Sequence, residues 1–170
     1  MGLMDILNQY VGQQGGQAAP AAVEHFGQVA QQVPQSTVSQ GLTEAFRSDQ
    51  TPPFGEMVGR LFGNSNPEQR AGLLTQLISG LGAGSATAGV GNAGPLGDLV
   101  RQLGGGGTPV TPEQAAAVTP EQVQQAATHA EQQNPGIVER VSDFYAQHST
   151  LVQTLGSAAL AIALAKMAQR

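Results

Sequence analysis

The same helix-start signal occurs three times in this chain of 170 residues. It reads Asn66-Pro67-Glu68-Gln69, Thr111-Pro112-Glu113-Gln114 and Thr119-Pro120-Glu121-Gln122. In each copy a side-chain oxygen can accept from the free N–H groups of a first turn, and proline follows where its missing donor does no harm. Asn134-Pro135 repeats the cap and the proline without the acid. The signal predicts an all-α fold without a sheet, with helices that begin within two residues of each of these prolines.

Apolar residues at helical spacing predict more short helices in the first half of the chain. We expect them near residues 3–11, 20–33, 36–48, 52–63 and 67–81. Ser36 or Thr37 would cap the third of these helices, and Gly63 would end the fourth in the left-handed conformation. The pattern predicts an N-terminal bundle of short helices.

Changes in composition divide the chain into three expected parts. Residues 81–94 are mostly Gly and Ala and bury little, and residues 104–107 are all glycine. A short helix with Leu96, Leu99 and Leu103 on one side lies between them. We therefore expect a helical bundle over residues 1–80, a Gly/Ala-rich linker with one short helix over 81–107, and a module of capped helices over 108–170.

The sparse charge argues against a nucleic-acid partner. Charged residues make up 11% of the chain, and the formal net charge is −5 at pH 7. The basic residues are scattered, and no aromatic residues interleave with them as a nucleic-acid surface would require. The chain has no cysteine, which excludes disulfides and thiolate metal sites and suits the cytoplasm. The start of the chain also lacks the basic region of a secretory signal.

The segment Gly89-Val90-Gly91-Asn92-Ala93-Gly94 matches the G-x-G-x-x-G pattern of dinucleotide-binding loops. That pattern requires a buried strand before the loop and an acidic residue about twenty positions after it. Here small residues precede the motif, and residues 101–112 contain no acid. We interpret the motif as part of the linker and expect no cofactor.

The polar residues do not form a pattern typical of catalysis or metal binding. None of the three histidines, His25, His129 and His148, has a second histidine four positions away on a helix. Asp143, His148 and Ser149 supply the residue types of a hydrolase triad, but no nucleophile elbow accompanies them. We therefore expect no catalytic residues and no metal site, and the chain is not expected to be an enzyme.

Parts of the first half resemble the YidB-like family of small bacterial proteins. The resemblance rests on the run of short helices and on three segments: Gly2-Leu3-Met4-Asp5-Ile6-Leu7, Leu96-Gly97-Asp98-Leu99 and Gln102-Leu103-Gly104. It covers roughly the first hundred residues and implies a homeodomain-like bundle, a bacterial origin and no catalytic residues to carry over. The capped helices after Thr108 depart from the short members of that family.

The C-terminal segment carries the functional prediction. Few polar side chains interrupt residues 151–168, and apolar ones surround the axis of a helix expected to run from Ser149 or Thr150 nearly to Arg170. A helix that is apolar all round must be covered all round, and its small residues would let a second helix approach closely. We expect copies of the protein to contact each other through six residues: Leu151, Leu155, Ala161, Ile162, Leu164 and Ala165.

Two functions follow from this helix. The first is a non-catalytic structural or interaction protein of the cytoplasm that forms a homo-oligomer through the helix. The alternative is a membrane-associated protein that uses the helix as an anchor, lying on or inserted in the inner membrane. The helix could also be the centre of its own domain. Lys166 and the Gln153-Thr154 pair favour the first function, because a dedicated anchor is usually longer and richer in large apolar residues.

Overall fold

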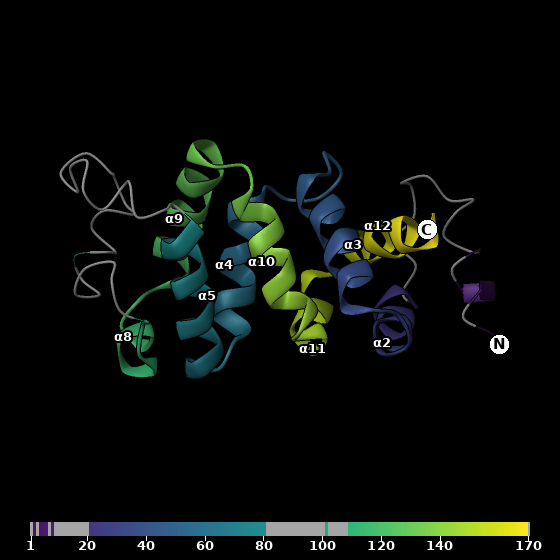
Figure 1. Ribbon diagram of the computed structural model, residues 1–170, viewed down its shortest axis with the longest axis horizontal. Coiled ribbons are helices and arrows are strands. Elements are labelled where there is room, and N and C mark those ends of the chain that lie inside the picture. Colours follow the sequence, from purple (N-terminus) through teal and green to yellow (C-terminus); the bar gives the residue numbers. More distant parts are fainter. Residues whose placement is uncertain are drawn as a thin grey trace. The chain divides into compact units, whose positions relative to one another are not determined.

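The computed structural model describes residues 21–80 and 109–169, together with Gly2, residues 4–6, Asn8 and Arg101. Within these residues the chain forms ten helical segments and no strand (Figure 1). The predicted all-α fold is therefore confirmed. The expected linker over residues 81–107 lies, except for Arg101, outside the described residues.

The helices follow one another along the chain with short connections. They are α2 (Ala22–Gln32), α3 (Gln35–Arg47), α4 (Phe54–Asn64), α5 (Pro67–Gly80), α8 (Pro112–Ala116), α9 (Pro120–Gln133), α10 (Ile137–Ala146), α11 (Ser149–Val152), the 3₁₀ helix η2 (Gln153–Leu155) and α12 (Ser157–Ala168).

All four predicted helix starts are confirmed. Helices α5, α8 and α9 begin at the proline of the repeated signal, and α10 begins two residues after Pro135. In each of the three full signals, the cap side chain accepts from the backbone N–H of the glutamine. The glutamine side chain in turn accepts from the N–H of the cap residue, at 2.8–3.3 Å. These reciprocal bonds satisfy donors that a helix start otherwise leaves to water.

Two helix boundaries differ from the prediction. Helix α3 begins at Gln35, after Pro34, and has no side-chain cap; the Pro34 carbonyl instead accepts from Thr37 N. Helix α4 continues through Gly63, whose φ is not positive. The end of α4 is closed by Arg70, whose guanidinium donates to the carbonyls of Phe62 and Gly63 at 2.9 and 3.0 Å. That arginine makes a left-handed glycine unnecessary.

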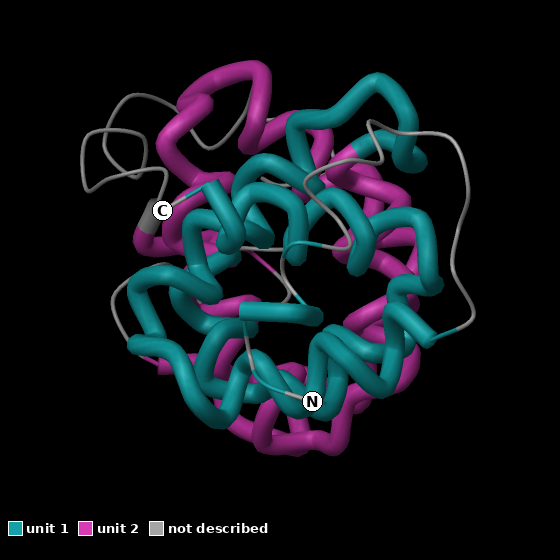
Figure 2. Tube along the Cα trace, turned by 90° about the vertical axis from the view of Figure 1, so that its right-hand side faces the viewer, with its two compact units in different colours: residues 1–53, 142–170 teal, residues 54–141 magenta. Residues whose placement is uncertain are grey.

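The helices group into two compact units, coloured separately in Figure 2. Unit 1 comprises residues 1–53 and 142–170, and unit 2 comprises residues 54–141. This division differs from the boundaries expected at residues 80 and 108. Helices α4 and α5, which the sequence placed with the N-terminal bundle, pack instead against α9 and α8. Unit 1 is consequently built from two pieces of chain that lie far apart in the sequence.

Unit 2 is centred on the packing of α4 against α9. The apolar residues of α4 that the sequence placed inward are all buried: Phe54, Met57, Val58, Leu61 and Phe62. Gly55 and Gly59 are also buried, and they face the backbone of α9 around Gln124. Because glycine has no side chain, these positions let the two helix backbones approach closely.

Unit 1 is centred on α3 and α2, which α12 covers. The predicted inward face of α3 is confirmed, since Val38, Leu42, Ala45 and Phe46 are buried. Phe26 and Val29 of α2 are fully buried in the same unit. The last helix of the chain therefore completes a core begun by two of the earliest ones.

Candidate interaction site

The segment from Ser149 to Ala168 is not the continuous helix that its composition predicts. Helices α11 and η2 end at Leu155, and α12 begins at Ser157. Gly156 between them has φ 97° and ψ 161°, and no other described residue has a positive φ. Side chains of L-amino acids exclude this conformation almost completely, so glycine is what permits the break.

The face of α12 that packs inside unit 1, here called the inner face, contains the large apolar residues. It consists of Ala159, Leu160, Ala163, Leu164 and Met167, which are all buried. Gly41 of α3 lies under this face: a Cβ built on it would be 2.7 Å from the carbonyl oxygen of Ala163. The absence of a side chain at Gly41 therefore allows α12 to lie close against α3.

An ion pair marks the edge of this contact. The Lys166 ammonium of α12 lies 3.3 Å from the Glu44 carboxylate of α3. Both side chains are well exposed, so water and salt screen the attraction. The pair contributes more to the register of α12 on α3 than to stability.

The opposite side of α12 carries small apolar residues that unit 1 leaves partly uncovered. Ala158 is exposed, and Ala161, Ile162 and Ala165 are intermediate in exposure. Their spacing puts them on one side of the helix, which we call the outer strip. No member of the strip is charged, and Ile162 is its only large side chain.

The structure divides the six residues of the predicted contact between two surfaces. Ala161, Ile162 and Ala165 lie together in the outer strip, and Leu151 is partly exposed on α11. Leu155 and Leu164 are buried within unit 1 at 5% and 0% exposure. The premise that the chain cannot cover these two leucines itself is therefore wrong. Gly156 followed by Ser157, a preferred helix-capping residue, was the sequence signal for the break that turns the inner face inward.

The residue types of a hydrolase triad make structural contacts. The Asp143 carboxylate accepts a short hydrogen bond from the Ser39 hydroxyl of α3, and Gln35 donates to the Asp143 carbonyl at 3.4 Å. The His148 ring packs against Phe144, with ring centroids 4.9 Å apart. The glycine motif over residues 89–94 lies outside the described residues.

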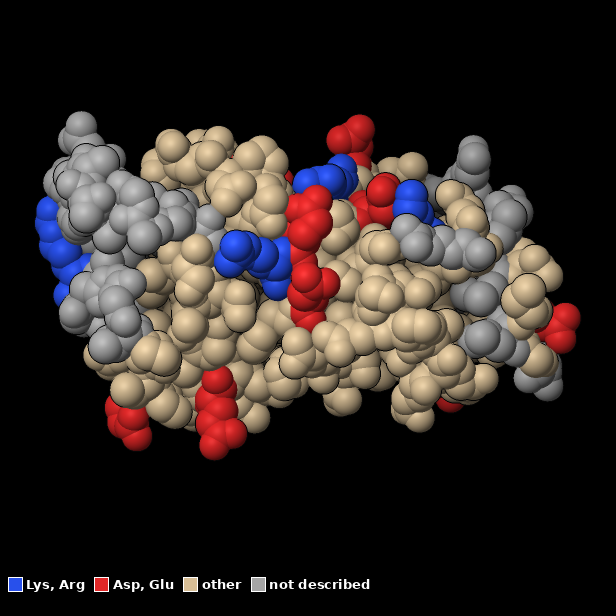
Figure 3. All heavy atoms as spheres, viewed as in Figure 1, with Lys and Arg blue, Asp and Glu red and all other residues tan. Residues whose placement is uncertain are grey.

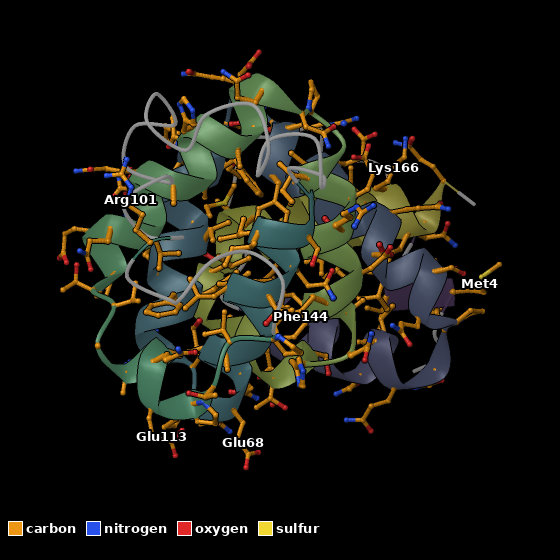
Figure 4. The ribbon with its side chains drawn as sticks, turned by 60° about the vertical axis from the view of Figure 1, so that its left-hand side comes forward. Met4, Glu68, Arg101, Glu113, Phe144 and Lys166 are labelled. Carbon is orange, nitrogen blue, oxygen red and sulfur yellow. The ribbon has the colours of Figure 1, made fainter. Side chains whose placement is uncertain are left out.

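The rest of the described surface offers little concentrated chemistry. No group of three or more His, Asp or Glu side chains in the described part of the chain could hold a metal ion. On the face drawn in Figure 3, charged side chains are few and mixed in sign. Glu68 and Glu113 point outward at the starts of α5 and α8 (Figure 4), where an acid stabilises the first turn. Across the described ranges, no helix combines the length and the hydropathy needed to cross a bilayer.

Comparison of the chain with known protein families, with curated proteins and with solved structures finds no match. The resemblance to the YidB-like family therefore stays a prediction from the quoted segments.

Proposed function

We propose that this protein is a non-catalytic interaction protein that associates with itself through the outer strip of α12. The observation that carries the proposal is the strip itself. It presents Ala158, Ala161, Ile162 and Ala165 at helical spacing, with no charged member, on a helix whose other face is already buried.

The chemistry of the strip favours a second helix as its partner. Alanine side chains let two helix backbones come close together, so that many weak dispersion contacts form along the crossing. An uncharged strip also brings no ion that would have to be stripped of water. A second copy of α12 offers the same small residues and can meet the strip symmetrically.

The polar residues support a non-catalytic role for the described part of the chain. The Asp143 carboxylate is engaged by Ser39, and the Glu44 carboxylate faces Lys166. Each of these contacts holds one helix of unit 1 against another. We therefore assign them to the fold rather than to a reaction.

The test is the size of the protein in solution. Light scattering across a range of concentrations should report a dimer or larger species for the natural chain. The double variant A161E/A165E should shift to the monomer, because it places two carboxylates in the strip. Circular dichroism should show unchanged helix content, since neither position belongs to the inner face.

The matched control is Q125E/Q132E, which adds the same two charges at exposed positions of α9. It should leave the size unchanged. A natural chain that is monomeric at every concentration would show the proposal to be wrong. Sedimentation with lipid vesicles that is lost in A161E/A165E would assign the strip to a membrane surface instead.

A further inference from the structure

Two parts of the described chain repeat one pattern of three helices. The first pattern is α2, α3 and α4, and the second is α9, α10 and α12, with α11 and η2 added before the last helix. Pro34 and Pro135 occupy the turn between the first and second helices. The matching buried residues are Ala22, Phe26 and Val29 with Val123, Ala127 and Ala130; Val38, Leu42 and Phe46 with Ile137, Val141 and Tyr145; and Val58, Leu61 and Phe62 with Leu160, Ala163 and Leu164.

The third helix of each pattern packs on the first helix of the other pattern. In unit 1, α12 lies against α2 and also against α3. In unit 2, α4 lies against α9. Each pattern is thus completed by a helix from a distant part of the chain. The surface of α2 and α3 is built to receive a third helix that does not directly follow it in sequence.

The segment before α12 can take two conformations with the same sequence. In the structure, the positive φ of Gly156 breaks the helix and turns the inner face of α12 onto α3. The composition of residues 151–168 instead favours one uninterrupted helix. Gly156 is exposed, and a Cβ built on it would meet nothing within 4 Å. Nothing packed against this position therefore prevents its backbone from becoming helical.

We propose that α12 swings out about Gly156 and docks on α2 and α3 of a second copy of this chain, while the second copy returns its own α12. In the exchanged dimer, residues 149–168 form one helix. The contact uses the inner face of α12, and so it goes beyond the association through the outer strip.

The exchange is favourable because the closed chain and the exchanged dimer share their main contacts. Leu160, Leu164 and Met167 are buried against α2 and α3 in both forms, and Glu44 meets Lys166 in both. Exchange of identical elements between copies is a low-cost route to a dimer, since only the hinge changes conformation.

The Glu44–Lys166 pair provides the test, because the chain has no cysteine of its own. The single variants E44C and K166C are mixed in equal amounts in denaturant, refolded together and oxidised. Random pairing places one copy of each variant in about half of the exchanged dimers. Cys replacing Glu44 in one copy then meets Cys replacing Lys166 in the other, and a disulfide-linked heterodimer forms.

Two controls fix the interpretation of this experiment. E44C mixed with Q125C, an exposed position of unit 2, measures random collision and should give much less heterodimer. The double variant E44C/K166C at low concentration should close the disulfide within one chain. If the E44C and K166C mixture links no more than the Q125C control, the exchange is wrong.

Repeating the mixture in the A161E/A165E background separates the exchange from the proposed function. Heterodimers that persist there support the exchange, because the outer strip has been disabled. Heterodimers that disappear there would assign the linkage to the outer strip and overturn the exchange.

The variant G156A tests the hinge directly. Alanine is strained at the observed φ and favours a continuous helix, so the dimer association constant should rise at least about tenfold. The matched control G63A lies within α4, where a Cβ has only an ordinary contact with Pro120, and should leave dimerisation unchanged. No change in association for G156A would contradict the proposed hinge.

Discussion

Gly55 of α4 lies directly against the backbone of Gln124 of α9. A Cβ built on Gly55 would be 2.7 Å from the Gln124 carbonyl oxygen and would also overlap the Thr128 hydroxyl. A carbonyl in the middle of a helix cannot move away without loosening that helix. The glycine therefore sets the distance between the two helices on which unit 2 is centred.

The variant G55A should destabilise unit 2. The added methyl group forces α4 away from α9, and overpacking of this kind costs about 1–3 kcal/mol. Urea unfolding should show the loss as a lower midpoint with an unchanged slope. G63A is the matched control, since its Cβ would lie 3.6 Å from Pro120 and should be tolerated. Equal stability of the two variants would mean that α4 and α9 are not held at this distance.

The variant T119A should weaken the start of α9. It removes the hydroxyl that accepts from Gln122 N at 3.3 Å, and loss of such a cap costs about 1 kcal/mol. T119S keeps the oxygen and should retain most of the stability. Thermal or urea unfolding of the two variants provides the comparison, and an equal loss in both would show that the methyl group rather than the cap matters.

The variant D143A should cost more than S39A. Ser39 is only 6% exposed and donates to the Asp143 carboxylate, so D143A leaves a buried hydroxyl without that acceptor. The penalty for such a group is about 1–3 kcal/mol. Asp143 itself is exposed, and water can replace Ser39 when S39A is made. In a double-mutant cycle, D143A should cost less in the S39A background; strict additivity would contradict this coupling.

The variant R70A should loosen the end of α4. Arg70 donates to two carbonyls there, and its guanidinium carbon lies 5.0 Å from the centre of the Phe62 ring. Removing these bonds should lower the free energy of unfolding by about 1–2 kcal/mol. R70K should be intermediate, because one ammonium group cannot reproduce the planar fork. Amide exchange at the last turn of α4 should accelerate in both variants, and unchanged exchange would rule out the capping role.

The sequence predicts the helix starts well because the chemistry of a cap is local. Asn66, Thr111 and Thr119 act on groups three positions away, and that interaction can be identified in any four-residue window. The ends were harder to predict. Gly63 looks like a terminator locally, and only the folding of Arg70 back onto α4 shows why a left-handed glycine is not needed.

The grouping of the helices could not be predicted from local patterns. Which helix covers α4 or α2 is decided by contacts between segments far apart in sequence. The signals for those contacts are glycines that leave room for a partner backbone, namely Gly41, Gly55 and Gly59. Glycine also occurs in helices that have no close neighbour, so these positions become informative only beside α12 and α9. The candidate site was predicted in part for the same reason. Its outer residues were found, whereas the break at Gly156 places Leu155 and Leu164 inside.

The division of unit 1 between the two ends of the described chain has a consequence during protein synthesis. Helices α2 and α3 are made early, but α12, which covers them, follows only after the whole of unit 2. At about 5–20 residues per second, the ribosome needs roughly ten seconds to make the intervening chain. Unit 2 can finish folding in that time, while Phe26, Leu42 and Phe46 wait without their cover. The nascent chain thus presents a transient apolar surface to chaperones, and the order of translation delays completion of unit 1 until last.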